Sequence, residues 1–398
     1  MKYKNLLHLN ESQVKELVKR YYAGENVQRL LDDYSLQVFP SRLYTLLPPM
    51  EFTDDGFQCE YCGSNLIAEN LSKAAFRDIY CGYDRDKLFC PQCSHRPFDA
   101  KCNCPACIKK REKKVAQRRA KISEKYSTKA RVKDFLKLAF RDKVFLGAVC
   151  DSMLSDDTSV ILSLEDLDEL SPLAPTEQFS LNIIETLLQS QLIKISLSSP
   201  IDAFEWDSGE SLVEYNLQKL NFLLNVDYDG QVNACVEKMH HADFFDADSA
   251  DELEVAAAIA LWKELAVEEC YQYLVFQLKE LRLNHTPQKR CRMVFRKILE
   301  NFSIQEIYYF IWKQLQYISL KLRQRQITEK HAVNYIVPGC ERYAELVLEH
   351  EWQTRKLVRP KDLPFSVMTD YLFNKVLKIG ESTGFGCPPN IKYLLESD

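Results

Sequence analysis

The sequence contains no uninterrupted apolar run of about 18 residues, the length that a helix needs to cross a membrane. Its first ten residues hold lysines among a few leucines, so we expect neither a signal peptide nor a membrane span. It also contains no Walker loop, no G-x-G-x-x-G string and no H-E-x-x-H string. No catalytic signature stands out, which leaves an enzyme unsupported and favours a protein that acts by binding.

The length and composition are those of an ordinary globular protein. A chain of 398 residues is long enough for roughly two to four domains, because single cores usually stop growing below that length. The 46% hydrophobic and 27% charged composition argues against global disorder and against a fibrous repeat.

The fourteen cysteines are unevenly distributed. Eight of them fall between Cys59 and Cys107, mostly in closely spaced groups, and the other six are scattered singly. Clustered thiolates of this kind hold metal, whereas lone cysteines serve as small apolar residues in cores. The distribution suits a reducing compartment, so we expect a cytoplasmic protein.

The net charge of −5 hides a strong asymmetry along the chain. Residues 101–150 hold 16 Lys and Arg against 4 Asp and Glu, residues 151–260 hold 3 against 23, and residues 281–330 hold 11 against 3. Two basic blocks therefore flank an acidic one, which would pair with them or hold a basic partner.

The hydrophobic patterning predicts a mainly α, multidomain protein. We expect a helix-turn-helix over residues 1–50, a cysteine-rich, zinc ribbon-like module over 51–107, and a basic linker helix over 108–130. A small acidic α+β domain, compatible with a winged helix, should follow over 131–249. It would hold an amphipathic helix at 134–150, a helix from Pro175, and strands at 192–197 and 212–226. Residues 250–398 predict an α-helical domain, with a capping box at Ser303 and Glu306.

Three short helices are expected in the first 48 residues. The first begins at a capping box of Asn10 and Gln13, the second spans 27–34, and the third spans 40–47. This arrangement resembles the helix-turn-helix domains of transposases, resolvases and small repressors. Helices of that kind read DNA with the third helix. Candidate contacts to bases or phosphates there are Ser41, Arg42, Tyr44 and Thr45.

Two C-x2-C pairs predict one metal site. Two intervening residues allow both sulfurs of a pair to reach one tetrahedral ion, and Gly63 gives the backbone freedom wanted after such a turn. The pairs are separated by 27 residues, which implies an inserted hairpin or helix. The four expected ligands are Cys59, Cys62, Cys90 and Cys93.

A denser group, C-x-C-x2-C, predicts a second metal site at Cys102, Cys104 and Cys107. The fourth ligand could be Cys81 or His95; eight cysteines divide evenly into two sites of four, so Cys81 is preferred. We expect two structural zinc ions, with an iron-sulfur cluster as the alternative.

The helix that leaves the cysteine module is rich in cations. Only Glu112 and Glu124 offset them, so this helix would neutralise several phosphates and make nucleic-acid binding dependent on salt. A solvated linker is the alternative. The cations are Lys109, Lys110, Arg111, Lys113, Lys114, Arg118, Arg119, Lys121 and Lys125.

Two other patterns are weak signals for chemistry. The G-x-S-x-G string at residues 380–384 lacks the preceding strand and following helix of a nucleophile elbow, so we interpret it as a flexible turn. The second pattern is an acidic, histidine-containing loop, interpreted as solvated, with His240, His241, Asp243, Asp246 and Asp248.

Several segments resemble those of uncharacterised bacterial proteins of similar length. They are the N-terminal helices, the CPQCSHRPF segment from Cys90, and residues 198–204 and 327–334. The resemblance implies no activity and no site residue. Our leading hypothesis is a zinc-containing, DNA-binding regulatory or accessory protein of the bacterial cytoplasm. The alternatives are a zinc-stabilised scaffold that binds a protein, such as a toxin or defence effector, and a nucleic-acid-processing enzyme.

Overall fold

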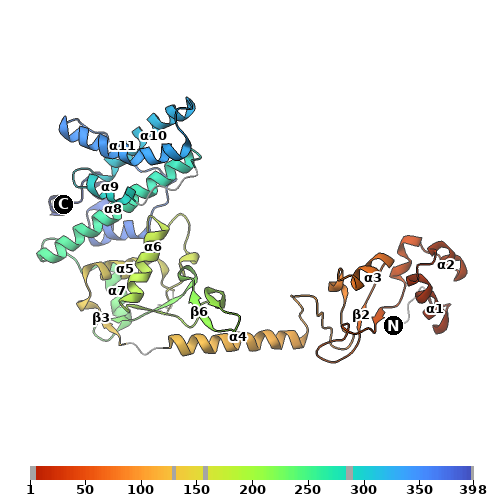
Figure 1. Ribbon diagram of the computed structural model, residues 1–398. Helices are drawn as coiled ribbons and strands as arrows, with labels where there is room; N and C mark the ends of the chain where they lie inside the picture. The colour runs from red at the N-terminus through yellow and green to blue at the C-terminus, as the bar shows by residue number, and fades with distance from the viewer. Residues whose placement is uncertain (1–5, 128–130, 156–159, 284–289, 396–398) are drawn as a thin grey trace. The chain divides into compact units, whose positions relative to one another are not determined.

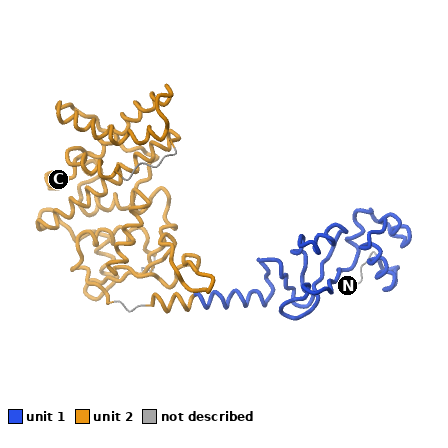
Figure 2. Tube along the Cα trace, viewed as in Figure 1, with its two compact units in different colours: residues 1–118 blue, residues 119–398 orange. Residues whose placement is uncertain are grey.

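A computed structural model describes residues 6–127, 131–155, 160–283 and 290–395 (Figure 1). Residues 1–5, part of the segment assessed for a signal peptide, lie outside this range. Helices hold 55% of the chain and strands 8%, which confirms a mainly α protein. The chain forms two compact units, residues 1–118 and residues 119–398 (Figure 2), where the sequence predicted a finer division into five parts.

The first unit contains short helices and one small sheet. Its elements are α1 (Glu11–Tyr22), α2 (Val27–Asp33), the 3-10 helix η2 (Pro40–Thr45), β1 (Met50–Phe52), β2 (Leu66–Ala68), α3 (Lys73–Tyr80), the 3-10 helix η3 (Arg85–Lys87) and the start of α4 (Pro105–Tyr126). β1 and β2 pair antiparallel, with Met50 opposite Ala68. The capping box predicted at Asn10 and Gln13 is confirmed.

The third N-terminal helix differs from the prediction. It is a 3-10 helix that ends at Thr45, because Pro40 opens it and Pro48 and Pro49 follow closely. A helix-turn-helix needs a longer α-helix at this position, so that expectation stays a prediction.

The N-terminal helices pack against α3. The Tyr22 hydroxyl donates a hydrogen bond to the Leu71 carbonyl at 3.0 Å, and the Tyr22 ring lies 4.6 Å from the Phe76 ring. Lys73 donates to the Glu25 carbonyl and lies over the Tyr21 ring. These contacts make residues 1–50 and the cysteine module one packed unit.

The second unit begins with small sheets and buried helices. Its elements up to residue 241 are β3 (Lys133–Asp134), the 3-10 helices η4 (Phe135–Lys137), η5 (Leu164–Asp166), η6 (Ile201–Ala203) and η7 (Leu217–Lys219), α5 (Phe140–Met153), α6 (Glu177–Gln189), β4 (Ile193–Ile195), β5 (Phe204–Trp206), β6 (Leu212–Tyr215), β7 (Phe222–Leu224), β8 (Val226–Asp227) and α7 (Val232–His241). β3 pairs parallel with β8, whereas β4 with β7 and β5 with β6 pair antiparallel.

The rest of this unit is helical. It contains α8 (Glu252–Glu280), α9 (Arg290–Ile298), α10 (Ile304–Arg323), α11 (Glu329–Glu349), α12 (Val367–Asp370), the π-helix η8 (Tyr371–Val376), α13 (Gly380–Gly386) and α14 (Ile391–Leu395). The capping box predicted at Ser303 and Glu306 is confirmed. One continuous apolar core includes Phe145 of α5, Trp262 of α8 and Tyr371 of η8, so it runs across the boundary predicted near residue 250.

The helix predicted at 134–150 starts later and is not amphipathic. Lys133 and Asp134 form β3, and the Asp134 carboxylate accepts a hydrogen bond from the Leu136 N–H at 3.1 Å, which favours a 3-10 turn there. The helix α5 begins at Phe140 and is buried on nearly every side. At Gly147 a Cβ would lie 2.0 Å from the Tyr371 hydroxyl, so only glycine permits this approach of η8.

A buried carboxylate joins α8 to the segment that precedes α12. Glu269 is fully buried and accepts hydrogen bonds from the Thr369 hydroxyl at 2.6 Å and from the Arg359 guanidinium at 3.4 Å. Arg359 also donates to the carbonyls of Leu363 and Pro364, both at 2.6 Å. A buried carboxylate is tolerated only with such partners.

Replacing Arg359 by alanine should leave the Glu269 carboxylate buried without its counter-charge. We expect the free energy of unfolding to fall by about 3–5 kcal/mol. Burial raises the pKa of this carboxyl, so the folded variant would hold the proton more tightly than the unfolded chain does. Its stability should fall further as pH rises above about 4.3, the pKa of an unfolded glutamate. Urea denaturation at low and at neutral pH measures both effects.

Lys263→Ala is the matched control, because it removes one partner of the more exposed ion pair with Glu300. That change should lower stability by less than about 1 kcal/mol. Wild-type stability of Arg359→Ala at both pH values would contradict the role given to the buried pair.

Candidate metal centres

The two C-x2-C pairs adopt the same local fold. The Gly63 N–H donates to the Cys59 carbonyl and the Ser94 N–H to the Cys90 carbonyl, both at 2.9 Å. Gly63 and Ser94 both have left-handed backbones, with φ values of 71° and 56°. This turn directs the two sulfurs of each pair toward the same point.

The pairs come together into one group of four thiols. Cys59 Sγ lies 3.5 Å from Cys93 Sγ, and Cys62 Sγ lies 3.3 Å from Cys90 Sγ. A tetrahedral ion with metal–sulfur distances of about 2.3 Å separates its sulfurs by about 3.8 Å. The group therefore has the size of a four-thiolate metal site, as its spacing in the sequence predicts.

The second group consists of three thiols and one imidazole. His95 Nδ1 lies 3.6 Å from the sulfurs of Cys102 and Cys104, and 3.4 Å from the sulfur of Cys107. A tetrahedral ion would separate a sulfur and a nitrogen ligand by about 3.5 Å. The described residues thus hold two groups that are compatible with two metal ions.

The fourth residue of this group corrects the preference for Cys81. Cys81 caps the C-terminus of α3, where its thiol is exposed, and it belongs to neither group. His95 follows the second C-x2-C turn directly, and its side chain is 3% exposed. Chain continuity therefore places the imidazole at the second group, whereas the helix carries Cys81 elsewhere.

In each group, hydrogen bonds lower the pKa of one thiol below the ordinary value for cysteine. Hydrogen bonding with the Ser64 side chain lowers the pKa of Cys62 to about 6. Burial opposes ionisation of Cys102, but the N–H groups of Arg96 and Cys104 outweigh burial and lower its pKa to about 6. Burial raises the pKa of Cys93 to about 12. Metal binding at neutral pH must therefore displace the proton of Cys93.

Side chains of the first C-x2-C turn also contact the second group. Glu60 Oε1 lies 3.6 Å from His95 Nε2, a buried nitrogen without a hydrogen-bond partner among the described residues. The Tyr61 ring packs edge-on against the His95 ring, and its hydroxyl lies 3.6 Å from Cys107 Sγ. A carboxylate beside the free ring nitrogen orients a metal-binding histidine. Neither role is predictable from spacing, because Glu60 and Tyr61 lie inside the C-x2-C motif of the other group.

The helix α4 begins inside the second group. Cys107 lies in its first turn, and the Ile108 N–H donates to the Cys104 carbonyl at 3.0 Å. Arg111 donates to the Cys102 carbonyl at 2.6 Å and to the Asn103 side chain at 3.0 Å. The start of α4 is therefore fastened to this group.

The cations predicted to bind nucleic acid fall into two sets. Lys109, Lys110 and Lys113 are exposed and make no ion pair among the described residues. Arg119 donates to the carbonyls of Leu197 and Ser199. The rest also have partners within the protein: Arg111 and Lys121 at carbonyl groups, Lys125 over the Tyr126 ring, and Lys114 and Arg118 through further contacts.

The four candidates near residue 42 are not equally available. Ser41 and Arg42 are exposed. Tyr44 packs partly against the core of the N-terminal helices. The Thr45 hydroxyl donates to the Arg42 carbonyl at 2.8 Å.

The weaker chemical signals find structural explanations. The G-x-S-x-G string forms the short helix α13, so its interpretation as a flexible turn is wrong; the Gly384 carbonyl accepts a hydrogen bond from the Trp262 indole at 3.1 Å. His240 Nδ1 lies 3.0 Å from Asp151, and the described histidines and acids of that loop form no ligand group.

Among the described residues, no helix has the length and apolarity required for a membrane span. No protein-family model, curated protein or solved structure matches the chain. The resemblance to bacterial proteins of similar length therefore stays a prediction.

Metal content will distinguish His95 from Cys81 as the fourth ligand. We expect two metal ions in the wild-type chain, one in His95→Ala, and two in the control variant Cys81→Ser. Elemental mass spectrometry of protein purified without added metal provides the count. One ion in Cys81→Ser and two in His95→Ala would instead show that Cys81 is the fourth ligand.

Removal of the Glu60 carboxylate should weaken the second centre alone. We expect Glu60→Gln to release its second ion about tenfold more readily to a chelator, because the imidazole loses its orienting partner. Stepwise chelator competition measures the release. Glu69→Gln, an exposed change in the same module, is the control. If both variants retain the second metal ion equally well, Glu60 does not contribute to this centre.

Proposed function

We propose that this protein is a zinc-containing, DNA-binding regulatory or accessory protein of the cytoplasm, without catalysis at its metal centres. Zinc is the metal that best suits four thiolates at one centre and three thiolates with an imidazole at the other. Each group supplies four protein ligands, which leaves no open position for substrate. Both ions would therefore stabilise the fold and would not act as Lewis acids.

The observation that carries DNA binding is the row of free cations on the first turns of α4. Successive residues of an α-helix are about 100° apart, so Lys109, Lys110 and Lys113 lie within about 100° of one another around the axis. Arg111 points elsewhere and fastens the helix to the carbonyl of Cys102. The second metal centre thus holds three exposed ammonium groups on one helical face, where they would contact successive phosphates.

Arg42 supports the same proposal from the N-terminal helices. It is exposed, makes no ion pair among the described residues, and lies close in the chain to the exposed ring of Phe39. An arginine in this position can bind a guanine edge or a phosphate. It would add to the contacts of α4, and the length of η2 limits how many bases this segment reaches.

Salt dependence tests the proposal. The slope of log affinity against log salt concentration becomes shallower by about 0.9 for each phosphate that the protein no longer neutralises. The triple variant Lys109→Gln, Lys110→Gln, Lys113→Gln should therefore reduce the slope by about 2.7. Fluorescence anisotropy with a labelled duplex at several salt concentrations, on protein with both metals bound, measures it.

A matched triple variant in the second unit controls for net charge: Lys330→Gln, Lys361→Gln, Lys392→Gln. All three lysines are exposed, and their replacement should leave the slope unchanged. If the metal-loaded wild-type protein binds no duplex, DNA binding is wrong, and a scaffold that binds a protein becomes the better explanation of the metal module.

A further inference from the structure

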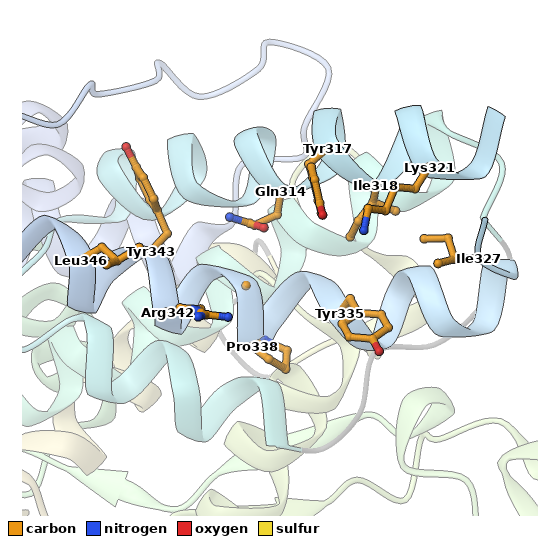
Figure 3. A pocket seen from close by; sticks show the side chains of 11 residues that line it. Gln314, Tyr317, Ile318, Lys321, Ile327, Tyr335, Pro338, Arg342, Tyr343 and Leu346 are labelled. Atoms are coloured by element: carbon orange, nitrogen blue, oxygen red, sulfur yellow. The ribbon is translucent and has the colours of Figure 1, made fainter. Parts of the chain in front are cut away.

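A cavity lies between α10 and α11 of the second unit. Its volume is about 540 Å³, within the range of sites that hold one small ligand. Figure 3 shows side chains from both helices directed into it. At its middle the helices approach closely, since a Cβ at Gly339 would lie 2.4 Å from the Gln314 side-chain oxygen.

Two tyrosines line this cavity without aromatic partners. Tyr317 comes from α10 and Tyr335 from α11, and they are 55% and 62% exposed. Among the described residues neither ring packs against another aromatic ring, whereas Tyr343, at one end of the cavity, lies 5.2 Å from the Phe310 ring. In Figure 3 Tyr317 extends from α10 toward α11, whereas the Tyr335 ring lies over α11 with its hydroxyl directed away from α10. Tyr335 offers a flat face for a planar group, and so does the side of the Tyr317 ring that Lys321 does not cover.

The charge that lines the cavity is entirely positive. Lys321 and Arg342 line it, and no Asp or Glu does. In Figure 3 the two cations lie on either side of the tyrosine pair. Lys321 Nζ lies 4.6 Å from the centre of the Tyr317 ring, and Arg342 makes no ion pair among the described residues.

Two of the four glutamates of α11 have partners on α9. Glu341 and Glu345 each lie 3.0 Å from Lys297 of α9. This pairing satisfies the negative charge of α11 on its α9 side. The cations of the cavity are therefore left to bind an anion that comes from solution.

We propose that this cavity binds a free nucleoside phosphate, with the base against Tyr317 and Tyr335 and the phosphate at Arg342. Bases stack on aromatic side chains whatever their identity, and a guanidinium binds phosphate through paired N–H groups. A single nucleotide also suits the volume of the cavity better than a length of chain does. This site does not depend on DNA binding by the first unit.

Calorimetry on the full-length, metal-loaded protein tests the site with AMP, adenosine and inorganic phosphate. Because base and phosphate both contribute, AMP should bind at least about tenfold more tightly than either part alone. Absence of AMP binding up to about 1 mM would overturn the proposal. A single-stranded oligonucleotide that displaces AMP and binds more tightly would also overturn it, in favour of a nucleic-acid strand.

Variants of the lining residues test where AMP binds. Tyr335→Ala and Arg342→Gln should each weaken AMP by about tenfold, while Tyr335→Phe keeps the stacking face and should stay within about twofold of wild type. Arg342→Gln should leave adenosine unaffected. Lys330→Gln, an exposed change on the same helix outside the cavity, controls for charge. If both Tyr335→Ala and Arg342→Gln bind AMP with wild-type affinity, AMP does not bind in this cavity.

Discussion

Two successive residues, Ser94 and His95, link the two metal groups, because Ser94 closes a turn of the first group and His95 is a member of the second. The Ser94 N–H closes the second C-x2-C turn at the Cys90 carbonyl, and the His95 carbonyl accepts the Cys90 N–H at 2.8 Å. The His95 imidazole then enters the other group beside Cys107. Ser94 and His95 are adjacent in the chain, so the backbone of the first group sets the position of a ligand in the second. The second group in turn positions the start of α4 and the lysines on its first turns.

The second unit is stabilised differently. Its helices share one apolar core, into which the lone cysteines 150, 235, 270, 291 and 340 are packed as small buried side chains. Burial raises the pKa of these thiols, which keeps them protonated and apolar. The Glu269–Arg359 pair is one of the polar interactions in its interior, and the cavity between α10 and α11 leaves aromatic surface uncovered. The residues that line this cavity are therefore separate from those of the buried ion pair.

Local spacing made part of this structure predictable. The C-x2-C pairs, the three clustered cysteines and the capping boxes at Asn10 and Ser303 depend on neighbours in the chain, and the sequence predicted them; the capping box at Ser163 was not predicted. Spacing alone does not identify the fourth ligand, because Cys81 and His95 both lie close in sequence to the three clustered cysteines. Only the position of Cys81 at the C-terminal end of α3 excludes it. The length of the third helix was overestimated, since apolar periodicity does not distinguish an α-helix from a 3-10 helix beside prolines. The exposure of Tyr317 shows a similar limit: helical periodicity indicates which face a residue occupies, and only packing shows whether another helix covers it.

The ligand spacing of the two groups has a consequence for the order in which the first unit folds. His95 and Cys107 are 12 residues apart, whereas Cys62 and Cys90 are 28 apart and enclose β2 and α3. Closing the shorter loop loses less chain entropy and requires no intervening sheet or helix to form first. A metal ion can therefore nucleate residues 95–107 early, and the fixed His95 then limits the conformations that Cys90 and Cys93 must search. On this path the group farther along the chain acts as a template for the earlier one.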